Sequence, residues 1–462
     1  MKLLISVLLS LFLNVINVNS QIYTSNWTSI NSRPLPSWYD SVKFGIFIHF
    51  GVYSVPAYSD GGYAEWYWWN LESGDDNNST KQWHGEHFGP NFKYQDFAPM
   101  FNCRDFNAND WASIIDKSGA KYVVLTSKHH EGYTLWPSEQ SWGWNSVDVG
   151  PNRDIVAELT KAVKNLGLHM GLYHSLFEWF NPFYLSDKSS GNPPTKEEYV
   201  DTVLMPQLMD IVNSYEPHVI WADGDWEQAS DYWKSTDFLS WLYTNSSVKD
   251  VVVVNDRWGH GCRNTNGGFF TGSDAWLPNK LIDHKWENCE TIGFSYGYDQ
   301  FEPAKAYTNS TILIQKFSQT VSCGGNFLLD IGPDAEGTIP INMQNTLLDI
   351  GYWLQINGES IYDSSPWRVQ NQTSSIWYTT NKSNGAIYAL VFEYPESGQL
   401  LLNDPICNSN SQVNLLGFKS ASKITIQLPK SNDQPGITLN LPFASPQDYP
   451  PFVYVFKLVG CN

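Results

Sequence analysis

The segment Val219–Trp226 reads Val-Ile-Trp-Ala-Asp-Gly-Asp-Trp and joins an apolar strand pattern to two acidic residues. Asp223 and Asp225 come directly after the apolar run, and Trp221 and Trp226 flank them. Barrels of α/β type place reactive side chains at the carboxyl ends of their strands. The segment therefore indicates a catalytic carboxylate set among rings that can stack on a sugar. Because Asp-Gly is also a strong turn signal, the alternative is a simple hairpin.

Strand-like and helix-like patterns alternate on both sides of this segment, which favours a parallel sheet over an antiparallel one. Strand patterns, several of them ending in polar residues, cover residues 43–51, 120–127, 168–175, 250–258 and 326–331. Helical periodicity covers residues 94–119, 153–166, 196–215, 230–243, 311–323 and 342–356. The alternation predicts an α/β fold, a (β/α)8-like TIM barrel that carries the catalytic residues.

The pattern of apolar and polar residues changes after about residue 365. Short β-like segments at 375–379, 386–392, 423–428, 437–441 and 452–459 are separated by Asn, Ser, Pro and Gly. No long helical pattern follows, so this region predicts an antiparallel β-sandwich. We expect a signal peptide at 1–20, a catalytic barrel at 21–364 and a C-terminal β-sandwich domain at 365–462.

The N-terminus predicts entry into the secretory pathway. Met1–Ser20 has a basic residue, Lys2, then a short interrupted apolar run and a small-residue cleavage site. Asn-X-Ser/Thr triplets, the acceptors of N-glycosylation, agree with this: they begin at Asn26, Asn77, Asn78, Asn245, Asn309, Asn371 and Asn381. The expected location is the lysosome or the extracellular space.

The six cysteines and the overall charge exclude several classes of protein. An even cysteine count permits disulfides, while the wide spacings without Cys-X-X-Cys speak against a zinc site or a redox motif. The net charge of −19 speaks against nucleic acid as a partner. No second apolar stretch is long enough to act as a membrane anchor. The aromatic content of 15% suits stacking on sugars, although most of these rings must fill the core.

Polar residues follow several of the expected strands and form a candidate binding site. His49 ends the first strand, where the alternative is a buried structural histidine. Glu65 and Trp66 lie in the next loop, which could instead be a packing cluster. His129 and His130 follow the second strand. Adjacent strand residues point to opposite sides, and no further ligand cluster follows, so we interpret the pair as hydrogen-bonding groups and expect no metal.

Several motifs then agree with one family in order and spacing. They are Lys-Phe-Gly-Ile-Phe-Ile-His-Phe-Gly at 43–51, Lys-His-His-Glu-Gly at 128–132, Trp-Ala-Asp-Gly-Asp-Trp at 221–226, Asn-Asp-Arg-Trp-Gly at 255–259, Lys-Trp-Glu-Asn-Cys at 285–289 and Gly-Gly-Asn-Phe-Leu-Leu at 324–329. With these motifs the chain resembles the α-L-fucosidases of glycoside hydrolase family 29, close to the lysosomal animal type. The resemblance covers nearly everything after the signal peptide.

The resemblance implies a barrel related to (β/α)8 with a C-terminal β-sandwich, and a retaining glycosidase that needs no cofactor. Asp223 matches the family nucleophile, which forms a covalent fucosyl-enzyme. A second carboxyl group, roughly 5–5.5 Å away in a retaining pair, is then the acid/base. The residues that match the fucose pocket of the family are His49, Glu65, Trp66, His129, His130, Tyr173, Trp221 and Arg257.

Two residues compete for the acid/base role. Asp274 aligns with the position favoured in the nearest animal relatives, and we lean towards it. Glu287 belongs to the Lys-Trp-Glu-Asn-Cys motif and equally suits a structural ion pair. Cys289, in the same motif, is expected to pack or form a disulfide rather than to act as a nucleophile.

The expected function is removal of terminal α-L-fucose from glycoproteins, glycolipids and oligosaccharides. The expected partners are fucosylated glycans, and relatives of this kind favour a homo-oligomer. Two alternatives stay open: a fucose-binding lectin that has lost turnover, and a retaining glycosidase for another sugar such as galactose. Retention of Asp223 together with Asp274 and Glu287 argues against the lectin.

Overall fold

The computed structural model describes residues 21–420, 423–429 and 435–462, so the expected signal peptide lies outside the described residues. At its centre is a parallel sheet of seven strands in the order β5-β4-β3-β2-β1-β7-β6. Its strands are β1 (Phe44–Ile48), β2 (Tyr122–Lys128), β3 (His169–Ser175), β4 (Val219–Asp223), β5 (Val253–Val254), β6 (Trp286–Thr291) and β7 (Gly325–Ile331).

A short irregular segment joins the two edge strands of this curled sheet. The backbone N–H of Phe269 donates to the carbonyl of Val254 at 3.0 Å, and the N–H of Glu287 donates to the carbonyl of Phe270 at 2.8 Å. A Cβ on Gly268 would lie 1.9 Å from the carbonyl oxygen of Val254, so only glycine permits this approach. The segment closes the ring between β5 and β6, as the predicted (β/α)8-like barrel requires.

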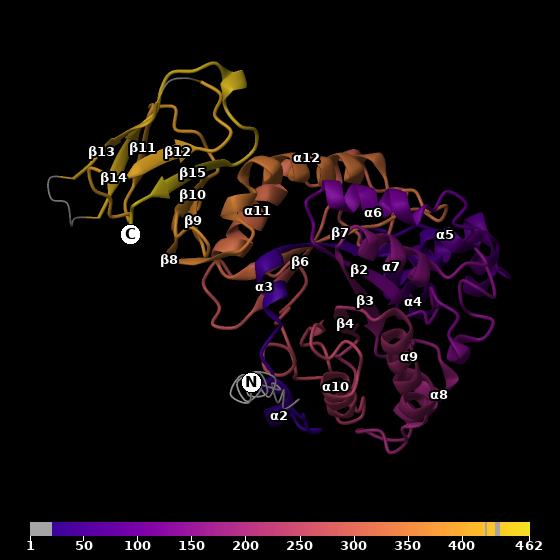
Figure 1. Ribbon diagram of the computed structural model, residues 1–462. Coiled ribbons are helices and arrows are strands. Elements are labelled where there is room, and N and C mark those ends of the chain that lie inside the picture. The colour runs from indigo at the N-terminus through magenta and orange to yellow at the C-terminus, as the bar shows by residue number, and fades with distance from the viewer. Residues whose placement is uncertain (1–20, 421–422, 430–434) are drawn as a thin grey trace, which may run out of the picture.

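Side chains alternate along the strands between the barrel interior and the surrounding helices. Val219 and Trp221 of β4 belong to the interior cluster, while Ile220 and Ala222 belong to the larger core outside it. The helices that cover the outside are α6 (Ala108–Lys117), α7 (Ile155–Asn165), α9 (Met205–Tyr215), α10 (Ser235–Thr244), α11 (Ser310–Ser322) and α12 (Ile341–Asn357), as Figure 1 shows. Shorter helices, α2 (Trp27–Asn31), α3 (Ser37–Val42), α4 (Tyr67–Ser73), α5 (Ser79–His87) and α8 (Pro182–Ser189), lie before β1 and in the loops.

Several sequence-based boundaries were wrong. The helix expected at 94–119 is a 3-10 helix, Tyr94–Met100, followed by a loop and α6. The helix expected at 196–215 opens with a π-helical turn, Val200–Leu204, before α9. Pro206 in the first turn of α9 has no backbone N–H, which accounts for the irregular start.

The strand expected at 250–258 is only two residues long, and β6 was not predicted. The side chain of Asn255 explains the short strand, because it replaces the ladder bonds of the backbone. Its Nδ2 donates to the carbonyl of Ala222 at 2.8 Å, and its Oδ1 accepts from the N–H of Ala222 at 3.2 Å.

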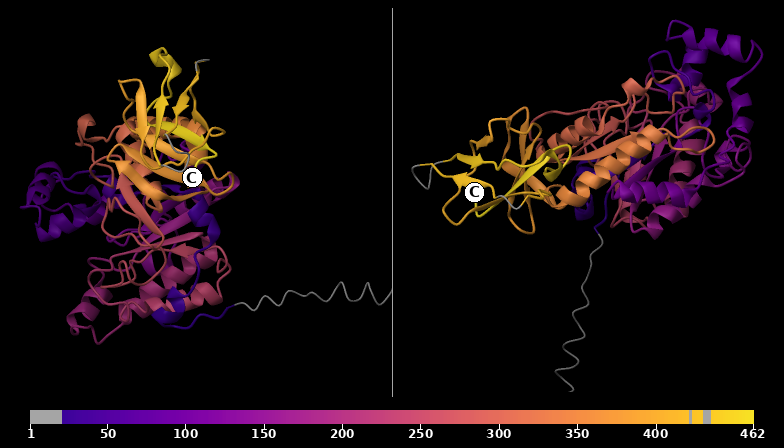
Figure 2. Two further views of the ribbon diagram at one scale, coloured as in Figure 1. Left: turned by 90° about the vertical axis from the view of Figure 1, so that its left-hand side faces the viewer. Right: turned by 90° about the horizontal axis from the view of Figure 1, so that it is seen from above.

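The C-terminal region consists of two antiparallel sheets, as predicted. One contains β8 (Ser364–Thr373), β9 (Ile376–Asn381), β10 (Ile387–Val391), β12 (Gln412–Leu415) and β15 (Tyr454–Val459), and the other β11 (Gln399–Leu402), β13 (Thr425–Gln427) and β14 (Ile437–Asn440). A disulfide joins Cys407 to Cys461. These sheets lie at one end of the molecule (Figure 2), and the five-stranded sheet contacts α11 through β8 and β9. The indole of Trp353 in α12 donates to the carbonyl of Val453 at 2.9 Å.

The structure can be compared with two further predictions, the lack of a membrane anchor and the N-glycosylation sites. None of the helices in residues 21–420, 423–429 and 435–462 is long and apolar enough to cross a membrane. The sequon asparagines are exposed except Asn381, which is buried. Its Nδ2 donates to the carbonyls of Glu359 and Tyr362 at 3.0 and 3.3 Å. Because a glycan would have to replace both bonds, the folded structure argues against the predicted glycosylation at Asn381.

Candidate active site

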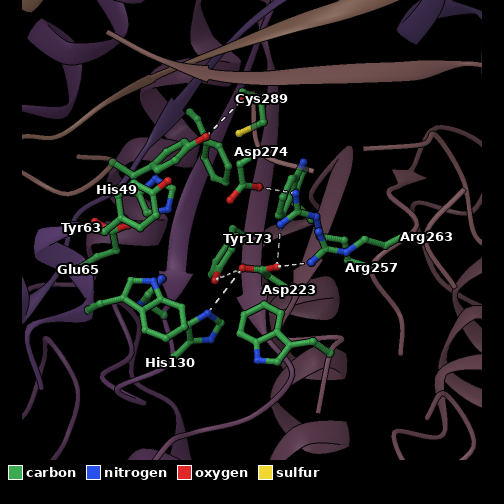
Figure 3. Close-up of a pocket in the computed structure, with 16 residues that line it drawn as sticks. His49, Tyr63, Glu65, His130, Tyr173, Asp223, Arg257, Arg263, Asp274 and Cys289 are labelled. Carbon is green, nitrogen blue, oxygen red and sulfur yellow. Dashed lines mark hydrogen bonds and ion pairs between the residues drawn. The ribbon is translucent and has the colours of Figure 1, made fainter. Parts of the chain in front are cut away.

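A pocket of about 330 Å³ opens at the carboxyl ends of the barrel strands, a volume within the range of small-molecule sites. The strands and the loops that follow them supply its walls, so residues far apart in sequence meet there (Figure 3). It is lined by Phe47, His49, Tyr63, Glu65, Trp66, His129, His130, Tyr173, Trp221, Asp223, Trp226, Arg257, Arg263, Asp274, Cys289 and Tyr296.

Asp223, the last residue of β4, stands in the middle of this pocket with both oxygens engaged. Its Oδ1 accepts from the guanidinium of Arg257 at 3.0 Å, and its Oδ2 accepts from the hydroxyl of Tyr173 at 3.0 Å. The Nε2 of His130 lies 3.6 Å from the same Oδ2. Burial, together with the neighbouring His129 and Lys128, holds the pKa of His130 well below its usual value, so this imidazole is neutral.

Arg257 links two of the acidic residues of the pocket, Asp223 and Asp274. A second nitrogen of its guanidinium donates to Oδ1 of Asp274 at 2.6 Å, and its Nε donates to the hydroxyl of Thr271 at 3.0 Å. The guanidinium lies over the ring of Trp221, 4.5 Å from its centre. Burial alone would raise the pKa of Asp274, but Arg257, with Arg263 further away, holds it below its usual value.

The opposite wall carries His49 and Glu65, each held by a buried partner. The Nδ1 of His49 shares a hydrogen bond of 2.7 Å with Oδ1 of Asp330, the penultimate residue of β7. The Oε2 of Glu65 accepts from the backbone N–H of Gly297 at 2.8 Å. Burial raises the pKa of Glu65, an effect that His129 partly offsets. These partners fix the orientation of groups suited to hydroxyl recognition.

Aromatic rings complete the walls of the pocket. The ring of Trp66 stacks on that of Trp226 with centroids 6.1 Å apart and meets His130 edge-on at 5.7 Å. The ring of Tyr173 stacks on Trp221 at 5.8 Å and on His129 at 5.7 Å. The result is a pocket with flat apolar faces and a few polar groups, which is typical of sugar sites.

Glu287 is the one candidate residue that does not line this pocket. It is fully buried in the barrel interior, 0% exposed. Its carboxylate accepts from the hydroxyls of Tyr39 and Tyr122 at 2.7 and 2.5 Å, and from the indole of Trp221 at 2.9 Å. Burial raises the pKa of Glu287, and these three donors oppose the rise.

Cys289 lies two residues further along β6 and does reach the pocket. Its thiol is free, and burial raises its pKa well above the usual value, so it is not a ready nucleophile. Its carbonyl accepts from the backbone N–H of Ala275 at 2.8 Å and from the hydroxyl of Tyr296 at 3.1 Å. The strand thereby anchors the loop that carries Asp274.

Sequence reasoning missed several lining residues, notably Arg263. The guanidinium of Arg263 pairs with both oxygens of Asp225 at 2.6 and 2.8 Å and also donates to the carbonyl of Gly272 at 3.0 Å. No local pattern marks such a residue, since it comes from a glycine-rich loop. Tyr63 and Tyr296 come from irregular loops as well. Within the part of the chain that the structure describes, no group of three or more His, Cys, Asp or Glu residues could hold a metal ion.

Two family models match this chain. The model described as alpha-L-fucosidase matches residues 10–359, and the model described as alpha-L-fucosidase C-terminal domain matches residues 370–459. The chain belongs to the alpha-L-fucosidase family. The alpha-L-fucosidase of Dictyostelium discoideum is 65% identical over 459 residues, which cover 99% of each chain. The human tissue alpha-L-fucosidase is 46% identical over 442 residues, 95% of this chain and 92% of the human one.

Solved structures of alpha-L-fucosidases have the same fold. The Thermotoga maritima alpha-fucosidase in complex with a mechanism-based inhibitor is 31% identical, with a TM-score of 0.79 over 95% of this chain and 100% of that one. The same bacterial enzyme in complex with fucose is 30% identical, with a TM-score of 0.78 at the same coverage. The fold expectation, a TIM-type barrel followed by antiparallel sheets, is confirmed.

Proposed function

We propose that this protein hydrolyses terminal α-L-fucosides of glycoproteins, glycolipids and oligosaccharides with retention of configuration. The observation that carries the proposal is the pair of carboxylates, Asp223 and Asp274, that reach one pocket and share the guanidinium of Arg257. Two carboxyl groups on one pocket are the equipment of glycosidases, both retaining and inverting, and the resemblance to the family supports retention. The family membership and the fucose complex of the bacterial relative support fucose as the sugar.

In the first step Asp223 attacks the anomeric carbon, and the bond to the leaving oxygen breaks. The bond electrons go to that oxygen, which takes a proton from Asp274, and a fucosyl ester forms on Asp223. Arg257 and Tyr173 donate hydrogen bonds to Asp223 and orient its carboxylate before the attack. In the second step Asp274 removes a proton from water, and the oxygen of that water attacks the anomeric carbon. The bond from this carbon to Asp223 breaks, its electrons return to the Asp223 carboxylate, and fucose leaves with retained configuration.

Asp274 must be protonated in the first step and ionised in the second, and its surroundings affect these two states differently. In the free protein Arg257 favours the ionised form of Asp274, which opposes an acid role. Substrate binding expels water and places an oxygen beside Asp274, which favours the protonated form. Once Asp223 has become a neutral ester, Arg257 has only Asp274 to balance, which favours the ionised base of the second step.

The remaining pocket residues are assigned to sugar binding. His49, Glu65, His129 and His130 are proposed to bind the hydroxyls, and Trp66, Tyr173 and Trp221 to form the ring walls. Glu287 is assigned a structural role beneath Trp221. We also propose the division into a catalytic domain at 21–364 and a β-sandwich domain at 365–462, and passage through the secretory pathway to the lysosome or outside, as suits relatives named tissue and plasma fucosidases.

The test is release of 4-nitrophenol from its α-L-fucoside near pH 5, beside the α- and β-galactosides and the β-D-fucoside. Turnover of the α-L-fucoside alone supports the proposal. Proton NMR of the first product should show α-L-fucose before mutarotation, and the β anomer would contradict retention. No turnover, with fucose still raising the melting temperature, would favour the lectin instead.

A further inference from the structure

A second cavity, of about 450 Å³, lies beside the active site and shares no lining residue with it. Four aromatic side chains line it: Trp68, Trp142, Trp144 and Phe180. One side-chain contact with the active site runs through Glu131, whose Oε2 lies 3.4 Å from Nδ1 of His129. The proposed fucose site makes no use of this cavity.

The most exposed of these rings is Trp142, with 87% of its surface open. A hydrogen-bonded turn keeps it there: the N–H of Gly143 donates to Oδ2 of Asp148 at 2.9 Å, and Nδ2 of Asn145 donates to the same oxygen at 2.7 Å. The N–H groups of residues 147 and 148 donate to Oδ1 of Asn145. Because the turn is held by its own bonds, Trp142 stays exposed instead of folding back onto the surface.

The other rings form a fixed wall. Trp68 stacks on Tyr94 with centroids 4.8 Å apart and packs against Phe180 at 4.6 Å. The indole N–H of Trp144 donates to the carbonyl of Glu131 at 3.0 Å. In the described part of the chain, the indole nitrogens of Trp68 and Trp142 have no protein acceptor, so both are open to a ligand or water.

Polar groups lie among the rings, but none of the described lining residues is Lys or Arg. Gln95 and Gln140 supply amides. The carboxylate of Glu131 is enclosed, with its side chain 1% exposed and its Oε2 3.4 Å from Nδ1 of His129, so it adds negative charge near the cavity without contacting a ligand. Glu178 is already satisfied by Lys128 at 2.9 Å and by Asn181 at 2.8 Å. A site with carboxylates and without cations disfavours anionic ligands. Flat rings with amide groups and no cation favour a neutral ligand with many hydroxyls.

We propose that this cavity is a second sugar site, which binds neutral hexose or N-acetylhexosamine residues of a glycan outside the fucose pocket. The choice of a glycan as occupant rests on the proposed function. Trp142 supplies an open ring face for stacking, and the wall of Trp68, Trp144 and Phe180 limits the depth of entry. The site increases affinity for extended glycans and leaves the chemistry at Asp223 unchanged.

The test combines binding and kinetics with two matched sugars. Lacto-N-tetraose has no fucose, and its calorimetric titration in the presence of saturating fucose, which occupies the first pocket, reports the second site. Trp142→Ala should weaken this binding about fivefold to tenfold. For the fucosylated counterpart, lacto-N-fucopentaose I, the same variant should lose kcat/KM about fivefold. Turnover of 4-nitrophenyl α-L-fucoside should stay within about twofold.

The control is Phe443→Ala, which removes another exposed ring, at 103% exposure, from the C-terminal region. It should change none of these values. Unchanged binding in Trp142→Ala, or equal loss with both fucosides, would overturn the second site. A change in sedimentation with unchanged binding of lacto-N-tetraose would instead assign Trp142 to contact between copies of the chain. If wild type does not cleave the aryl fucoside, the proposed function fails, while the titration still tests the site.

Discussion

The barrel carries acidic residues at two depths, one in the closed interior and one at the opening of the pocket, and their surroundings differ. In the interior layer, Glu287 accepts hydrogen bonds from Tyr39, Tyr122 and Trp221, and no water or ligand can reach it. At the mouth, Asp274 has a side chain that is 45% exposed and a single close partner, Arg257. Both oxygens of Glu287 accept hydrogen bonds from the protein. The carboxylate of Asp274 is partly exposed and can still bind a substrate.

This difference separates structural from chemical roles more clearly than residue type does. A carboxylate enclosed by neutral donors holds strands together and resists change of charge. A carboxylate that shares an arginine with another carboxylate responds when its neighbour changes charge. Trp221 belongs to both layers, since its indole nitrogen donates to Glu287 while its ring lies under Arg257. The interior layer therefore supports the floor of the pocket.

The largest expected effect comes from removing the central carboxylate of the mouth. Asp223→Gly should lower kcat for the aryl fucoside by about 10⁴-fold or more, because the covalent step loses its nucleophile. Circular dichroism should be unchanged, and azide, which fits the space left by the carboxylate, should restore part of the rate. Full activity in this variant would contradict the assignment of Asp223 as the nucleophile.

The comparison predicts that only one of the two remaining carboxylates shows leaving-group dependence. Asp274→Ala should slow cleavage of a fucosyl disaccharide by about 10²- to 10⁴-fold, because the sugar leaving group needs protonation. The aryl fucoside, with its acidic phenol, should suffer far less. Glu287→Ala should affect both substrates alike. The reverse pattern would exchange the two roles.

The interior layer is tested by stability rather than by rate. Glu287→Ala leaves three buried donors without an acceptor and should cost about 3 kcal/mol of unfolding free energy in urea. Glu287→Gln keeps the shape and one acceptor, so its loss should be smaller. Asp274→Ala serves as the matched control at the mouth and should change the unfolding free energy by less than about 1 kcal/mol. An equal loss of unfolding free energy in Glu287→Ala and Asp274→Ala would contradict the structural role assigned to Glu287.

The smallest expected effect lies at the opposite end of the barrel, where β3 begins. There Nδ1 of His169 lies 2.7 Å from Nδ1 of His218, and Trp38 stacks on His169 at 3.8 Å. Burial, and then His218, lowers the pKa of His169 to about 4. Lys164 and Glu216 are the charged groups facing His218.

Since the unfolded protein binds the proton of His169 at higher pH than the folded one, stability rises with pH between about 4 and 6.5. The contribution of His169 to the unfolding free energy is fully present above about pH 6.5 and is lost as the pH falls towards about 4. Urea midpoints of wild type should therefore decrease from pH 6.5 to pH 4.5, and His169→Gln should flatten that decrease. A slope unchanged by the substitution would show that other groups cause it.

Much of the fold and of the site could be predicted from local patterns. The strand and its terminal Asp223 were visible because burial demands apolar runs and parallel barrels place polar groups at strand ends. His49, His129 and His130 followed from the same rule, Tyr173 followed from the family resemblance, and all four line the pocket. The two-residue β5 and the closing segment at Gly268 were not visible, because side-chain bonds and a single close approach create them.

By itself the sequence determined the family, the barrel and the position of Asp223, because these depend on motifs and periodicity along the chain. Only the tertiary structure separates the positions of Asp274 and Glu287, since it places Asp274 in the pocket and Glu287 in the closed interior. Glu287 and Cys289 are two residues apart on β6, so both side chains face the barrel interior. The rings of Tyr39, Tyr122 and Trp221 enclose Glu287, whereas Cys289 lies nearer the opening and lines the pocket. Depth within a barrel depends on how strands from distant parts of the chain are staggered, and no local pattern records it.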